Sequence, residues 1–229
     1  SENLFKGLSP WLSKLPGGLV HVNVVGCALF AAISGSSAAT VATVGKMSIP
    51  ELRKRKYPEK LLLGSLAGSG TLGLLIPPSI ILIIYGVTIE DSIAKLFMAG
   101  ILPGIMIALM FMLYVIFWSI LNKKLMPKSI ESFSFLEKVH ESKQLLPVIL
   151  LILSVIGSIY TGIATATEAA SLGVIGALIL SFFQGTLNKN TFKLSLLGAT
   201  KTSCMIAFII AGSTFLSLAM GFTGLPRNL

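Results

Sequence analysis

Long apolar runs alternate with short polar or basic segments along this chain. A helix that crosses the hydrocarbon core of a bilayer needs about 20 mostly apolar residues. Because the segments between the runs are short, neighbouring helices must cross in opposite directions. The pattern therefore predicts an all-α integral membrane protein. Five runs reach the necessary length: 59–85, 93–121, 145–163, 165–184 and 198–220.

A sixth run, 18–45, is long enough to span the membrane but is interrupted in its middle. The sequence Ser-Gly-Ser-Ser occupies 34–37, and Thr40 and Thr43 follow within the next two turns. So many small polar residues disfavour a continuous lipid-facing helix. We expect two half-helices that meet at a polar tip.

The lysines and arginines suggest an orientation in the membrane. Most of them lie in three segments: 46–60, 123–143 and 189–201. The positive-inside rule places such segments in the cytoplasm. If 18–45 enters and leaves on the cytoplasmic side, Lys6 and Lys14 are cytoplasmic as well, whereas a spanning path puts both outside. The charge pattern therefore favours a re-entrant hairpin.

This interpretation divides the chain into successive segments. One of them, the polar connector 122–144, contains apolar residues between charges, and it fits either an amphipathic surface helix or a plain loop. The segments are a cytoplasmic lead-in 1–17, a re-entrant helical hairpin 18–45, a basic cytoplasmic loop 46–58, a broken transmembrane helix with the following helix 59–121, a cytoplasmic connector 122–144, and further transmembrane helices 145–229.

Composition supports the bilayer as solvent. Of the 229 residues, 54% are hydrophobic and 12% are charged, against about 25% charged in soluble proteins. The net charge of +9 does not indicate nucleic-acid binding, because basic and aromatic residues are not interleaved. Cys27 and Cys204 lie in apolar runs, so we expect small buried side chains and no disulfide. His21 and His140 lack the company that a metal site needs.

The interruption at 34–37 is a candidate site. Gly35 can adopt the backbone of a tight tip, and the hydroxyls of Ser34, Ser36, Ser37 and Thr40 can bind a ligand. Broken helices in transporters direct half-helix N-termini at anions and unwound carbonyls at cations. The alternative interpretation is that these small residues only let helices pack closely.

A second interruption follows in the run 59–85. Pro77 and Pro78 remove two backbone donors and force the chain out of helical geometry, well inside the membrane. Thr71, Gly73 and Ser79 flank them. A simple kink needs fewer of these residues than the chain provides, so we expect an unwound segment with carbonyls and hydroxyls directed at a ligand.

Outside the two interruptions, Glu168 is the one acidic candidate within the membrane. An ionisable residue there is a functional hypothesis, but a carboxylate that starts a helix is also favoured by the helix dipole. Both interpretations stay open. Asn23 is a further, weaker candidate for a polar contact inside the apolar run 18–45.

Several segments resemble the large membrane (M) subunit of the TRAP (tripartite ATP-independent periplasmic) transporters. The family usually has proline where Ala166 stands, which leaves the local helix geometry there open. The resemblance covers the whole chain, and the segments that carry it are Leu15–Leu19, His21–Val24 and Ser34–Ala38, then Gly70–Ser79 leading to Tyr85-Gly86, then Gly162–Ala170.

This resemblance implies an elevator-type transporter built from two inverted repeats. Each repeat contributes a re-entrant hairpin and a broken helix around the substrate site. Residues 18–45 then form the cytoplasm-facing hairpin, 59–85 its broken helix, and 145–220 the opening helices of the second repeat. The second hairpin and second broken helix are expected after Leu229, so we expect the chain to be a fragment of a longer protein.

The resemblance also implies a function. It predicts sodium-coupled uptake of an organic acid (a C4-dicarboxylate, sialic acid or another sugar acid) across the bacterial inner membrane, by a multi-pass protein that is not an enzyme. The coupling ions are sodium, with no ATP and no other cofactor. The expected partners are a small membrane (Q) subunit, a periplasmic substrate-binding (P) protein and the lipid bilayer, with no nucleic acid.

The candidate sodium- and substrate-binding residues come from the two interruptions. They are Ser34, Gly35, Ser36, Ser37, Gly73, Pro77, Pro78 and Ser79, with sodium ligands among Ser34, Gly35, Ser36, Ser37, Pro77 and Ser79. Weaker candidates are Asn23, Thr40, Thr71 and Glu168.

Two other functions deserve comparison. A stand-alone ion-coupled anion carrier or a channel would work without a binding protein, although charged rings typical of selectivity filters are absent from the sequence. A membrane-embedded hydrolase would use Ser36 or Ser37 as nucleophile, and His21 is the nearest base in the sequence. No arginine lies inside a predicted membrane segment, so the sequence does not name the organic acid.

Overall fold

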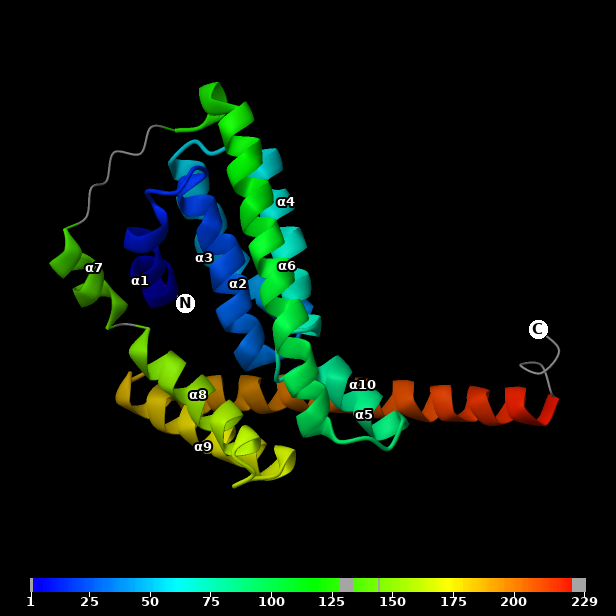
Figure 1. The fold of residues 1–229 in the computed structure, drawn as a ribbon. Coiled ribbons are helices and arrows are strands. Elements are labelled where there is room, and N and C mark those ends of the chain that lie inside the picture. The colour runs from blue at the N-terminus through cyan, green and yellow to red at the C-terminus, as the bar shows by residue number, and fades with distance from the viewer. Residues whose placement is uncertain (1, 128–133, 144, 224–229) are drawn as a thin grey trace. The chain divides into compact units, whose positions relative to one another are not determined.

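The computed structural model of residues 1–229 describes all of them except 1, 128–133, 144 and 224–229, and the described residues form helices only (Figure 1). This confirms the predicted all-α class. The α-helices are α1 (Glu2–Leu12), α2 (His21–Ser34), α3 (Ser37–Lys54), α4 (Glu59–Gly70), α5 (Ile80–Thr88), α6 (Ile93–Leu121), α7 (Phe135–Ser142), α8 (Leu146–Tyr160), α9 (Ala166–Phe183) and α10 (Lys189–Thr223). Short 3-10 helices are η1 (Gly18–Val20), η2 (Thr71–Leu74) and η3 (Lys123–Leu125).

Three described helices are long and apolar enough to cross a membrane: α6, α9 and α10. They correspond to the predicted runs 93–121, 165–184 and 198–220. The run 145–163 forms α8, which has 15 residues and is shorter than a typical span. Much of the apolar surface of α6 faces outward, with Leu102 77% exposed, as expected for a helix solvated by lipid.

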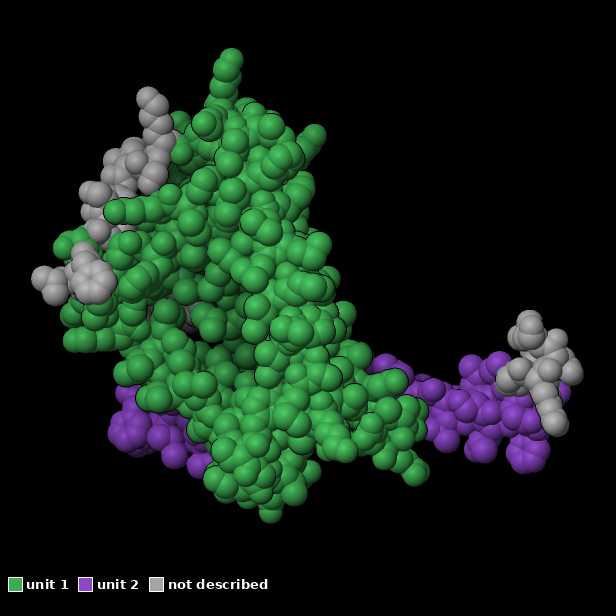
Figure 2. Space-filling model, viewed as in Figure 1, with its two compact units in different colours: residues 1–174 green, residues 175–229 purple. Residues whose placement is uncertain are grey.

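The chain divides into two compact units, Ser1–Val174 and Ile175–Leu229 (Figure 2). The second unit contains the end of α9 and all of α10. Between these helices the chain turns at Gly185, whose φ is +66°. Asn188 then caps α10, since its side-chain oxygen accepts from the Thr191 amide at 2.7 Å.

In the first unit, α2 and α3 form a helical hairpin that packs on α4. The helix α3 continues to Lys54, so most of the predicted basic loop 46–58 is helical. Arg53 and Lys54 in the last turn favour this extension because cations stabilise a helix C-terminus. In the connector, α7 shows that 135–142 is helical, while 128–133 lie outside the described residues.

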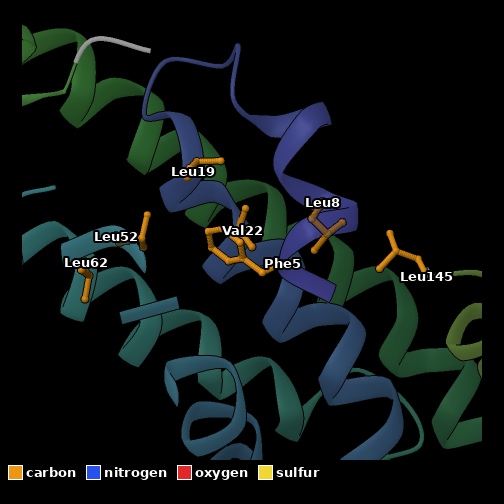
Figure 3. Close-up of a cluster of buried hydrophobic side chains, with 7 residues drawn as sticks. All are labelled: Phe5, Leu8, Leu19, Val22, Leu52, Leu62 and Leu145. Carbon is orange, nitrogen blue, oxygen red and sulfur yellow. The ribbon is translucent and has the colours of Figure 1, made fainter. Parts of the chain in front are cut away.

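The base of the hairpin, which is the end near Leu19 and Leu52, contains the main apolar cluster of the first unit (Figure 3). Its buried side chains come from several helices and hold the hairpin against α1, α4 and the residue that precedes α8. They are Phe5, Leu8, Leu19, Val22, Leu52, Leu62 and Leu145. A second cluster, of Phe97, Ile159 and Ala169, joins α6 to α8 and to the start of α9.

Candidate functional site

The tip of the hairpin is a two-residue reversal between α2 and α3. Gly35 ends α2 in the left-handed region, with φ 58° and ψ 13°, and its amide donates to the Ala31 carbonyl. Glycine adopts this conformation without the steric cost that a side chain adds. Ser36 is extended, and its hydroxyl caps α3 by accepting from the Ala39 amide at 3.4 Å. The chain thus reverses between two helices at the residues where the interruption lies.

Two hydroxyls beside the tip are engaged in holding it. The Thr40 hydroxyl donates to the Ser36 carbonyl at 2.8 Å, and it also lies 3.0 Å from the Ser34 hydroxyl. Thr40 is fully buried. Their geometry gives Ser34 and Thr40 a structural role in closing the turn.

The second predicted interruption is an unwound segment between two helices. α4 tightens into η2, and regular helix resumes only at Ile80. The Pro77–Pro78 peptide bond is cis, and neither proline has an amide hydrogen to continue a helix. The buried Ser79 hydroxyl bridges the break by donating to the Leu74 carbonyl at 2.7 Å. A simple kink is thereby excluded.

The structure brings the two interruptions together. The Ile80 amide donates to the Gly35 carbonyl at 3.3 Å, and a Cβ added to Gly35 would lie 2.7 Å from the Pro78 carbonyl oxygen. On the other side of the tip, a Cβ added to Gly73 would lie 2.9 Å from the Ser37 amide nitrogen. Two glycines therefore let the backbones of the tip and the unwound segment touch. We call this contact of 34–37 with 71–80 the junction.

Two glycines of α6 complete the junction, and sequence reasoning missed them. A Cβ added to Gly100 would lie 2.7 Å from the Leu75 carbonyl oxygen. One added to Gly104 would lie 3.0 Å from Cγ1 of Ile76. The small-xxx-small spacing, which lets membrane helices approach closely, was the signal that could have identified them.

The junction offers oxygen atoms and no formal charge. Segments 34–40 and 70–80 contain no charged residue. The Ser37 hydroxyl is buried without a hydrogen-bond partner among the described residues. Across the described residues no group of three or more His, Cys, Asp or Glu could hold a metal. Hydroxyls and unwound carbonyls of this kind are what transporters present to a monovalent cation.

Two of the weaker candidates, Asn23 and Thr71, lie in other environments. The Asn23 amide group donates to the Leu62 carbonyl at 3.2 Å and to the Ser65 hydroxyl at 3.0 Å, so Asn23 joins α2 to α4 away from the tip. Thr71 is exposed, and its hydroxyl donates to the Gly68 carbonyl.

Glu168 caps the start of α9. Its carboxylate accepts from the amide and from the hydroxyl of Thr165, each at 2.8 Å. This geometry favours the interpretation of Glu168 as a helix-start residue. Ala166 stands where the family usually has proline, and α9 begins at Ala166. The helix therefore starts there without a proline.

The positions of His21, Cys27 and Cys204 test the hydrolase hypothesis and the predicted burial of the cysteines. His21 Nε2 donates to the Pro16 carbonyl at 2.8 Å, and the 14-residue helix α2, about 21 Å long, separates His21 from Ser36. A base that far away cannot activate a serine, which excludes the hydrolase hypothesis. Cys27 is buried as predicted, whereas Cys204 is exposed on α10, because none of the α10 residues is buried.

Comparison with known proteins identifies the family. The family model described as "Tripartite ATP-independent periplasmic transporter, DctM component" matches residues 1–229. The chain belongs to this family. It is 34% identical over 219 residues to the C4-dicarboxylate TRAP transporter large permease protein DctM of Pseudomonas aeruginosa, covering 95% of this chain and 51% of that protein.

Other relatives carry the names of other solutes. The sialic acid TRAP transporter large permease protein SiaM of Vibrio cholerae is 33% identical, covering 100% of this chain and 53% of its own length. The isethionate TRAP transporter permease protein DctMQ of Oleidesulfovibrio alaskensis is 34% identical, with 100% and 36% covered. The chain thus spans about half the length of the large permease relatives it matches.

Proposed function

We propose that this chain is part of a secondary active transporter that couples the uptake of an organic acid to sodium across the bacterial inner membrane. The observation that carries the proposal is the junction. A buried contact of two unwound backbones, lined by hydroxyls and free of charged residues, suits a coupling ion better than it suits structural packing alone.

The dimensions of the first unit support a re-entrant hairpin. α2 has 14 residues, about 21 Å, and the uncharged part of α3 before Lys46, 37–45, covers about 14 Å. The stretch of α6 from Gly104, beside the junction, to its end at Leu121 rises about 26 Å. Each length is less than the hydrocarbon thickness of about 30 Å. The tip would therefore end inside the membrane, with both arms returning to the basic, cytoplasmic side.

Sodium ligands are proposed at the tip and in the unwound segment. Ser37 is the strongest candidate, because its buried hydroxyl has no partner among the described residues. The Pro77 carbonyl could add to the coordination, and the Gly35 and Ser36 carbonyls would have to exchange their present hydrogen bonds from Ile80 and Thr40 for the ion. Ser79 and Ser34 would act mainly by keeping these carbonyls in place, since their own hydroxyls are engaged within the turn and the break.

The interlocked glycines support an elevator motion. Because Gly35 and Gly73 hold the tip and the unwound segment in backbone contact, the hairpin and the broken helix would move as one body. An ion bound at the junction would travel with that body across the membrane.

The substrate and the partners are inferred from the relatives. Their names include a C4-dicarboxylate, sialic acid and isethionate at 33–34% identity and ectoine at 31%. Because the first three are anions, an organic anion is proposed without choosing among them. We further propose a small membrane (Q) subunit, in line with the combined name DctMQ of one relative, and a periplasmic (P) protein that delivers the solute.

Reconstitution of the full-length parent protein with its small subunit tests this function. Uptake of labelled organic acids into liposomes would be measured with the periplasmic protein added or withheld, and with the inward sodium gradient present or collapsed. Uptake should require both. Uptake that is indifferent to sodium and to the periplasmic protein would refute the proposal and favour a stand-alone carrier or a channel.

The variant Ser37→Ala tests the proposed ligand in the same assay. Loss of one ligating hydroxyl should raise the sodium concentration for half-maximal uptake by roughly tenfold, which corresponds to about 1.4 kcal/mol. Ser154→Ala is the matched control, because Ser154 is exposed on α8 and its hydroxyl donates to the Leu151 carbonyl. An unchanged sodium dependence in Ser37→Ala would remove Ser37 from the site.

A further inference from the structure

A cavity of about 510 Å³ lies at the base of the hairpin, at the end of the first unit away from the junction. The loop that follows α1 forms one wall, and Tyr57, just before α4, forms another. The last turn of α6 and the residues after it close the remaining side. None of the residues assigned to the transport site lines this cavity.

Two glycines shape the wall formed by the loop. Gly17 and Gly18 have φ values of +102° and +53°, a region that residues with side chains rarely adopt. A Cβ added to Gly17 would lie 3.1 Å from the Ser119 hydroxyl oxygen, so the loop lies directly against α6. The Leu19 amide donates to the Tyr57 hydroxyl at 3.1 Å, which fixes the loop to the opposite wall.

One polar side chain in this cavity is left without a partner. Ser119 is 4% exposed and lines the cavity, and its hydroxyl has no hydrogen-bond partner among the described residues. A serine within a helix usually bonds to a carbonyl one turn earlier. A buried hydroxyl that does not do so calls for another partner, and a ligand in the cavity could supply it.

The charge of the cavity selects an anion. Lys123 lines the cavity one helical turn after Ser119, and no acidic side chain is among its described lining residues. The nearby carboxylates of Glu51 and Glu59 are already paired with arginines of α3 and the residue after it. A lysine and an unpartnered hydroxyl that line the same cavity are suited to a phosphate group.

We infer that this cavity binds a phosphate group, carried by a membrane phospholipid or by a soluble phosphate compound. Apolar side chains of Leu15, Ile120 and Met126 also line the cavity, and they would contact the glycerol and upper acyl carbons of a lipid. Basic pockets between membrane helices on the cytoplasmic side are known to suit phospholipid headgroups. The inference does not depend on the transport function.

Binding to the purified full-length protein in detergent tests the inference. Titrations would use phosphatidylglycerol in mixed micelles, diacylglycerol in the same micelles as the lipid control without phosphate, and inorganic phosphate at constant ionic strength. Binding would be followed by native mass spectrometry and by the shift of the thermal unfolding midpoint. Lys123→Gln and Ser119→Ala should each weaken binding by roughly tenfold.

Lys124→Gln is the matched control. Lys124 belongs to the same 3-10 turn as Lys123 but does not line the cavity, so its loss should leave binding nearly unchanged. Ile120→Trp, which fills the cavity without removing a polar group, should block binding while the protein elutes and unfolds normally. This variant keeps the test valid if Ser119→Ala perturbs α6.

The titrations and variants distinguish a lipid headgroup from a soluble phosphate ligand, and they also show when the inference is wrong. Phosphatidylglycerol binding that depends on Lys123 and Ser119 identifies a lipid headgroup. The same dependence with inorganic phosphate identifies a soluble ligand. Equal losses in Lys123→Gln and Lys124→Gln, or binding that none of the variants changes, would overturn the inference, because general attraction to a basic surface would then explain the result.

Discussion

The two ends of the α2–α3 hairpin are stabilised by different interactions. At the base, side chains such as Val22, Leu52 and Leu62 are fully buried against one another. At the tip, the contacts are between backbones, made possible by Gly35 and Gly73. Apolar packing holds the base of the hairpin against its neighbouring helices. At the tip, the glycines bring no side chains, and backbone carbonyls and hydroxyls can face a ligand. Damage to the two ends should therefore have separable consequences.

The largest effect is expected at the tip. Gly73→Val would force side-chain carbons into the space of the Ser36 carbonyl and the Ser37 amide, and uptake in the reconstituted assay should be abolished. Gly64→Val is the control on the broken helix, because a Cβ there meets nothing within 4 Å. Full activity in Gly73→Val would show that the junction seen here is not needed for transport.

The next effect is expected at the base. Leu62→Ala should lower the free energy of unfolding by about 2–5 kcal/mol, since it leaves a cavity beside Val22 and Leu52. Leu63→Ala, at a position 44% exposed, should cost much less. Thermal unfolding measures both. The sodium dependence of uptake in folded Leu62→Ala protein should match the parent, and a shifted dependence would contradict the separation of base and tip.

A smaller effect is expected for the polar tie between α2 and α4. Asn23→Leu removes the bonds to the Leu62 carbonyl and the Ser65 hydroxyl, and hydrogen bonds between membrane helices contribute about 0.6–2 kcal/mol. We expect reduced thermal stability with unchanged sodium dependence. If the sodium dependence moves instead, Asn23 belongs to the transport site after all.

The smallest effect is expected for the surface ion pair between α3 and α4. Arg53 and Glu59 approach to 2.6 Å, but their side chains are 54% and 52% exposed. Such pairs are screened by solvent and salt, so Glu59→Gln should leave the thermal unfolding midpoint unchanged within error. A clear loss of stability would mean that this pair, and not the apolar cluster, determines the base of the hairpin.

Much of the candidate site could be predicted residue by residue. The Ser-Gly-Ser-Ser tip and the double proline were identified because glycine and proline act on their own backbone, whatever surrounds them. The extent of α3 to Lys54 was missed, since tertiary packing of Ser48 and Leu52 carries the helix through a segment that looks like a basic loop. The exposure of Cys204 was missed because an apolar run is not by itself a buried one.

The sequence by itself determined the all-α class, the helices α6, α9 and α10 that are long and apolar enough to cross a membrane, and the positions of both interruptions. Hydrophobic length and backbone chemistry are local properties. Only the tertiary structure decided that Gly35 meets Pro78, that Gly73 meets Ser37, and that Gly100 and Gly104 receive the unwound segment. These contacts join residues far apart in the chain. They depend on how helices pack, and no local pattern specifies which glycine will face which backbone.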